Sequence, residues 1–192
     1  MIQFFGGFAW AIALVVVLGA VALTILSIRL KQPLLALVGL VPIVLGIVAV
    51  ALGIRPPEPP VLPALVALSL AALAIIGGNP ITVWVLSLAT KSNSLGADHG
   101  GILVPDTTSV GTKSTTKTKE VLRGGTWIGY LERLAVVGAI AVGHFEIIAA
   151  VIAIKGLGRF SELDTPETRE RFIIGTLTSM IWAALCGALI VF

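Results

Sequence analysis

The sequence predicts an all-α fold, a polytopic transmembrane bundle of about six membrane-crossing helices with one polar cytoplasmic loop. The first observation behind this prediction is that only 12% of the 192 residues are charged, whereas soluble domains carry roughly 25%. The second is that 57% of the residues are hydrophobic and the mean hydropathy is +1.05. The third is that the hydrophobic residues gather in several long runs separated by short polar segments.

Three apolar runs fill the first 90 residues, at positions 8–28, 33–54 and 61–78. The first run has no basic residue before it and is longer than the apolar region of a signal peptide, so we expect a retained span. After the third run, Asn79 and Pro80 of the sequence "GGNP" predict the cap and first residue of a short helix over 81–90. That helix either continues from the third span with a kink or lies along the membrane interface.

Residues 91–125 form the one sizeable polar segment, which is rich in Gly, Ser and Thr. We expect a mobile loop there, with a small hairpin around "GILVP". Three further spans are predicted at 126–143, 144–160 and 172–192. The chain therefore divides into an N-terminal membrane region (1–90), a loop (91–125) and a C-terminal membrane region (126–192), within one structural domain.

The basic residues occur in the segments between the apolar runs, where they act as topology signals. With six crossings, every basic residue outside the fourth span except Arg55 falls on one side of the membrane: Arg29, Lys31, Lys91, Lys113, Lys117, Lys119, Arg123, Lys155, Arg159, Arg169 and Arg171. That side is expected to be the cytoplasm of a bacterium, with both termini outside. The net charge of +3 and the pI near 9.4 therefore indicate membrane orientation and no nucleic-acid partner.

The motifs of common enzymes are absent from the sequence. His99 follows Asp98 in a glycine-rich stretch, but two such residues are a weak signal for a metal site, and a polar turn is the simpler interpretation. The single cysteine, Cys186, lies inside the last apolar run, where a packing role is expected. We expect no catalytic activity, no bound metal and no cofactor.

Small residues recur at every fourth position in two of the predicted spans. In the last span they are Gly175, Ser179, Ala183 and Gly187. In the fourth span they are Ala135, Ala139 and Gly143. Residues at this spacing share one helix face, and small side chains there allow two membrane helices to approach closely. The partner helix of this seam belongs either to the same chain or to a second copy.

The charged residues of the fourth and fifth spans suggest an ion pair. If these spans form an antiparallel hairpin that turns near Gly143 and His144, Glu132 and Lys155 lie at the same depth, about 17 Å from the turn. An opposite charge on the neighbouring helix lowers the cost of each charge in the membrane. Arg159, one turn beyond Lys155, would reach the headgroups, and Glu146 would start the fifth span at the outer side.

The stretches "GGTWIGYLERL", "IAIKGLGRF" and "ERFIIGTLTS" resemble the C-terminal membrane region of a bacterial integral-membrane family of unknown function, in an actinobacterial form. The resemblance covers positions 124–192. It rests on Gly129, Leu131-Glu132-Arg133, Lys155, Arg159-Phe160 and Ile174-Gly175-Thr176-Leu177. It implies a membrane location and a bacterial source, and it implies no activity.

Two functions remain open at this point. The first is a non-catalytic membrane protein that acts in the lipid bilayer through assembly, as a homo-oligomer or with a partner membrane protein. The alternative is a small channel or transporter for an ion or small solute. Its polar lining would include Glu132, Lys155, Thr176 and Ser179.

Overall fold

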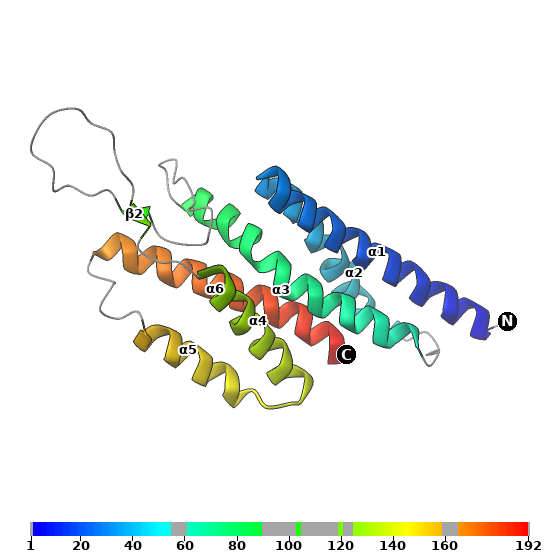
Figure 1. Cartoon of the computed structure of the whole chain (residues 1–192). Helices are drawn as coiled ribbons and strands as arrows, with labels where there is room; N and C mark the ends of the chain where they lie inside the picture. The colour runs from blue at the N-terminus through cyan, green and yellow to red at the C-terminus, as the bar shows by residue number, and fades with distance from the viewer. Residues whose placement is uncertain are drawn as a thin grey trace, which may run out of the picture.

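The computed structural model describes residues 2–54, 61–89, 103–104, 119–120, 125–158 and 165–191. For residues 2–5, 33, 103–104 and 119–120 it describes the backbone alone. The protein is an all-helical bundle, as the sequence predicts (Figure 1). Its elements are α1 (Ile2–Leu30), η1 (Pro33–Gly39), α2 (Leu40–Ala51), α3 (Leu62–Ala89), α4 (Gly125–Ala141), α5 (Glu146–Gly158) and α6 (Pro166–Val191). Within the polar segment, β1 (Leu103–Val104) pairs antiparallel with β2 (Lys119–Glu120). These strands lie farther apart in sequence than those of the small hairpin predicted around "GILVP" would.

Four helices of the described chain are long and apolar enough to cross a membrane, so the structure is consistent with a membrane protein. They are Gly6–Leu30, Leu34–Ala51, Leu62–Ala89 and Pro166–Val191. Helices α4 and α5 are shorter, with 17 and 13 residues, or about 26 and 20 Å at 1.5 Å per residue. The crossing of the membrane by α4 and α5 therefore stays a prediction.

Helix α3 corrects the predicted break at "GGNP". The third span does not end at Gly78, because α3 continues through Pro80 to Ala89 as one helix. Of the two alternatives for 81–90, the structure has the continuation, and no separate interfacial helix exists there. Pro80 has no N–H to donate to the Ile76 carbonyl four residues earlier, and side chains of α4 and α6 donate to the nearby carbonyls of Ile75 and Leu73.

Helix α6 begins at Pro166 and not near Phe172, six residues earlier than the apolar run. Thr165 Oγ1 accepts a hydrogen bond from the Thr168 backbone N–H at 3.2 Å, and Thr168 Oγ1 accepts one from the Thr165 N–H at 3.2 Å. This reciprocal cap, followed by proline at the first helical position, is a strong helix start. The hydrophobic pattern alone therefore placed the start too late.

Helix α4 ends in a tight turn that reverses the chain into α5. Gly143 has φ +76°, and the His144 N–H bonds to the Ala139 carbonyl oxygen at 2.8 Å. This is a Schellman motif, in which the left-handed residue favours glycine. The turn produces the α4–α5 hairpin predicted near Gly143 and His144. It also removes Gly143 from the fourth-span ladder, because α4 ends at Ala141.

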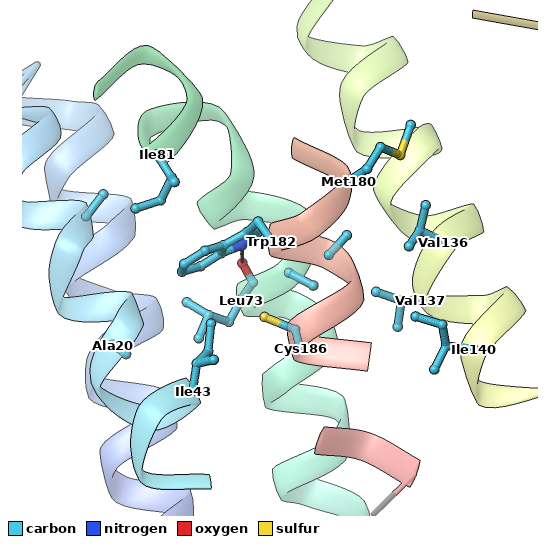
Figure 2. Packing of buried hydrophobic residues seen from close by; sticks show 13 residues of the cluster. Ala20, Ile43, Leu73, Ile81, Val136, Val137, Ile140, Met180, Trp182 and Cys186 are labelled. Carbon is cyan, nitrogen blue, oxygen red and sulfur yellow. Dashed lines mark hydrogen bonds between the residues drawn. The ribbon is translucent and has the colours of Figure 1, made fainter. Parts of the chain in front are cut away.

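Helices α3 and α6 pack against each other at the centre of the bundle, with α1 and η1 against α3 and α4 against α6 and α3 (Figure 1). Trp182 of α6 fills the space between two glycines. A Cβ atom on Gly39 would lie 2.9 Å from its ring, and one on Gly77 would lie 2.8 Å from it. The indole N–H donates to the Leu73 carbonyl oxygen at 3.2 Å, which Figure 2 shows as a dashed line. The glycines of η1 and α3 thus let three segments share one buried ring.

The ends of the helices are sorted as the charge pattern predicts. In Figure 1 the C-terminal ends of α1, α3 and α5 and the N-terminal ends of α4 and α6 lie towards one end of the bundle, and both chain termini lie towards the other. The first end carries the described basic residues Arg29, Lys31, Lys155, Arg169 and Arg171. Which end faces the cytoplasm stays a prediction.

Candidate functional site

Arg133 is a buried cation at the meeting point of three helices. It belongs to α4 and is only 3% exposed. Its Nε donates to the Ile75 carbonyl oxygen of α3 at 2.8 Å, and its Nη1 donates to Ser179 Oγ of α6 at 2.9 Å. The guanidinium thus supplies one of the side-chain donors that reach the backbone of α3 just before Pro80.

Gly78 of α3 and Gly129 of α4 make room for the Arg133 side chain. A Cβ atom on Gly78 would overlap Arg133 Cδ, and one on Gly129 would lie 3.2 Å from Nη1. The guanidinium carbon also lies 5.4 Å from the centroid of the Tyr130 ring, within the range of a cation–π interaction. Arg133 is therefore held by backbone, hydroxyl and ring, while its Nη2 has no hydrogen-bond partner among the described residues.

The predicted ion pair between Glu132 and Lys155 is present. Lys155 Nζ of α5 lies 2.5 Å from Glu132 Oε2 of α4, and the exposed fractions of the two side chains are 18% and 9%. The hairpin register brings the two residues level, as the sequence predicts. Because this pair uses the charge of Glu132, the adjacent Arg133 has no carboxylate partner in the described chain.

The other two predicted charges do not join this cluster. Glu146 is the exposed first residue of α5, and its Oε1 is 2.6 Å from Nδ1 of His144 in the preceding turn. This places it at the opposite end of the hairpin from Lys155. Arg159 lies outside the described residues.

A cavity of about 570 Å³ opens between α4, α5 and α6 and reaches α3. Its polar and charged lining consists of Asn79, Thr82, Thr126, Glu132, Arg133, Lys155, Arg171, Thr176 and Ser179. All four residues expected to line a polar pathway (Glu132, Lys155, Thr176 and Ser179) are included. Among the described residues, the lining holds three cations and one carboxylate, which gives it an excess of positive charge. The Thr82 hydroxyl oxygen, like Arg133 Nη2, is buried without a partner in the part of the chain that is described.

The small-residue seam of α6 faces other helices of the same chain. A Cβ on Gly175 would contact Thr82 of α3 at 3.5 Å, and one on Gly187 would lie 3.0 Å from Ile140 of α4. Ser179 accepts the bond from Arg133, and Ala183 is fully buried. The question left open by the sequence, whether the partner is internal or a second copy, is answered for these four residues: the partner is internal.

Sequence reasoning missed Arg133, although the hairpin register contained a signal. The register that pairs Glu132 with Lys155 sets Arg133 opposite Ile154, an apolar residue. An arginine within a span and without a carboxylate in register requires other partners, and the "GG" pair in α3 marked the place where a large side chain enters. The sequence pattern alone does not show that Arg133 contacts Ile75 and Ser179, because these residues lie far from it along the chain.

The fold and this cavity define a class of protein: a helical bundle with several membrane-capable helices and a partly open cavity whose described lining has more cations than carboxylates. Within the described residues, no group of three or more His, Cys, Asp or Glu side chains is placed to hold a metal ion. No protein-family model, curated protein or solved structure matches the chain. The resemblance of positions 124–192 to a bacterial membrane family therefore stays a prediction.

Proposed function

We propose that this chain is a non-catalytic integral protein of a bacterial cytoplasmic membrane that works as a channel or transporter for a small solute, through the cavity between α3, α4, α5 and α6. The observation that carries the proposal is the convergence of buried, unpartnered polar groups on a cavity inside a membrane-type bundle. Ionisable residues within membrane helices usually face the bundle interior or a water-filled cavity, where they mark the pathways of ions and substrates.

The position of the cavity also supports this proposal. It reaches from Arg171 in the second turn of α6, at the basic end of the bundle, to Ser179, eight residues deeper. At 1.5 Å per residue the two backbone positions are about 12 Å apart along the helix. A path of that length covers a large part of one membrane leaflet, whose apolar half is about 15 Å thick.

Assembly with a second copy or with another membrane protein is the second candidate. Its main support in the sequence was the seam on α6, which packs internally. What remains is the outer face of α5, a helix with no buried residue, where Ile152 and Leu157 are exposed. Lipid covers such a face as readily as a protein does, so the exposed face of α5 gives assembly no specific support.

The test is flux into liposomes that contain the purified chain. Thr176→Phe fills the cavity, whereas Leu177→Phe enlarges the next residue, which is half exposed on the outside of α6. An osmotic or ionic gradient should drive a solute movement that Thr176→Phe reduces and Leu177→Phe leaves unchanged.

Two results would favour assembly instead. One is the absence of any flux above empty liposomes. The other is a detergent-corrected mass that is a stable multiple of the 19.9 kDa chain and is unaffected by Thr176→Phe. Equal flux from the two phenylalanine variants would exclude the cavity as the path.

A further inference from the structure

We propose that the cavity binds an oxyanion, and that the ligand group is a phosphate held by Arg133 and Arg171 with Lys155 beside them. The inference rests on the proposed function for the location of the site. It adds the chemical class of the ligand, which the shape of the cavity alone does not give.

The charges that line the cavity favour an anion. Arg133, Arg171 and Lys155 are cations, and Glu132 is the one carboxylate among the described lining residues. Glu132 is already paired with Lys155 at 2.5 Å. A cation entering the cavity would meet two arginines and would have to compete with Lys155 for Glu132, whereas an anion would meet an excess of positive charge in a region of low dielectric constant.

The unused donors of Arg133 give the site its specificity. A guanidinium has five N–H groups, and the two bonds to Ile75 and Ser179 use Nε and Nη1. Nη2 is buried without a partner in the described chain, on a residue that is 97% removed from solvent. Burying charged donors unpaired is costly. A phosphate oxygen accepts such bonds well, because the planar fork of arginine matches the spacing of its oxygens.

A second unpartnered group comes from a different helix. Thr82 Oγ1 of α3 is buried and has no described partner, and Thr82 also lines the cavity. Lys155 uses one of its three N–H donors on Glu132, which is its one hydrogen bond among the described residues. Groups from α3, α4, α5 and α6 therefore converge on one space, and what they have in common is the ability to donate a hydrogen bond.

Two sources can supply the phosphate. Arg171 lies near the start of α6, at the end of the bundle where the basic residues gather, and a lipid headgroup can reach it from the membrane surface. A free inorganic anion can enter the same cavity and bind the same arginines. The chemistry of recognition is the same, so the experiment has one arm for each source.

The first arm uses inorganic phosphate with the full chain in a phosphate-free detergent. Thermal melting is followed by tryptophan fluorescence while phosphate is added, against sodium chloride at equal ionic strength. Phosphate should raise the melting temperature saturably. Arg171→Gln and Thr82→Val should weaken the apparent affinity, the first by about tenfold or more, since a hydrogen bond to a charged group contributes about 1.5–3 kcal/mol.

The matched control is Arg29→Gln, which removes the same charge at the same end of the bundle but from a side chain outside the cavity. Its affinity for phosphate should equal that of the wild type. Arg133 is not used as the test position, because it also ties α4 to α3 and α6.

The second arm uses native mass spectrometry with phosphatidylglycerol and, for comparison, diacylglycerol, which has the same tails and no phosphate. Selective retention of phosphatidylglycerol that Arg171→Gln abolishes and Arg29→Gln preserves supports the headgroup as the source. A saturable phosphate shift in the first arm with the same variant pattern supports a free anion.

The proposal is overturned if neither ligand is selected, or if Arg29→Gln and Arg171→Gln weaken binding equally; water alone would then fill the cavity. The outcome is separable from that of the flux test. Phosphate binding without any flux would leave an anion-binding protein that does not transport, and flux of a neutral or cationic solute without phosphate binding would keep the proposed function and remove this inference.

Discussion

Arg133 shows how a single side chain is accommodated in a bundle of this kind. A lone arginine at the centre of a membrane helix costs about 2.5–3.5 kcal/mol on insertion scales. Here two of its nitrogens bond to a backbone carbonyl and a hydroxyl, and its guanidinium lies against the Tyr130 ring. These contacts offset part of the cost and make the side chain a bridge between α3, α4 and α6.

Gly78→Ala should lower the stability of the bundle, because the new Cβ would overlap Arg133 Cδ. The expected loss is about 1–3 kcal/mol, the usual cost of overpacking. Gly138→Ala on α4 is the control, since a Cβ there meets nothing within 4 Å. Melting temperatures in the same detergent compare the two variants. If they melt together, Gly78 is not the close contact that the structure gives.

At the scale of elements, the α4–α5 hairpin has a weak hydrophobic attachment. Among the described helices α5 packs against α4, and none of its residues is buried. The Glu132–Lys155 pair and the turn at Gly143 therefore make a large share of its fixed contacts.

Glu132→Gln and Lys155→Met should each lower the melting temperature, because each leaves a largely buried partner charge unpaired. The double variant should recover part of the loss, with a coupling of about 0.5–3 kcal/mol. A double-mutant cycle of thermal unfolding measures this term. Losses that simply add would mean that the two residues do not interact.

Ser179→Leu should destabilise the packing of α6 by about 2–5 kcal/mol. It adds volume to a buried position and removes the acceptor of the Arg133 hydrogen bond. Ile181→Leu changes an exposed side chain two residues away and should stay within about 0.5 kcal/mol of the wild type. Chemical or thermal unfolding in detergent separates the two. Equal effects would count against the seam.

The elements differ in how far the sequence predicts them. The hairpin and its ion pair follow from a turn residue and a register, which are local. The start of α6 also depends on local sequence. It was missed because the first turns of the helix are charged and the prediction followed the apolar run alone. The path of α3 through Pro80 and the bonds of Arg133 depend on helices far along the chain, so propensity alone gives the wrong result for "GGNP". The sequence predicted four residues of the cavity lining: Glu132, Lys155, Thr176 and Ser179. The places of Arg133, Thr82 and Arg171 in that lining could be found only from the packing of the helices.

At the scale of the whole molecule, the gathering of basic helix ends at one end of the bundle allows a direct test of orientation. Cysteine at Ser114, in the polar segment, should resist a membrane-impermeant thiol reagent in intact cells, because that segment is expected in the cytoplasm. Cysteine at His144, which is exposed in the turn at the other end, is the positive control. The native Cys186 is buried and should stay silent in both. Rapid labelling at 114 would reverse the topology.

The contacts of α4 also have a consequence for the biosynthesis of the chain. Helix α4 leaves the ribosome carrying Glu132 and Arg133 before Lys155 of α5 and Ser179 of α6 have been made, whereas its acceptor on α3, the Ile75 carbonyl, already exists. With two unmatched charges and about 26 Å of length, α4 is a poor substrate for insertion on its own. We therefore expect it to enter the bilayer together with α5, docked on α3. A chain truncated after residue 145 should leave α4 outside the hydrocarbon core, and extension to residue 158 should bring it in.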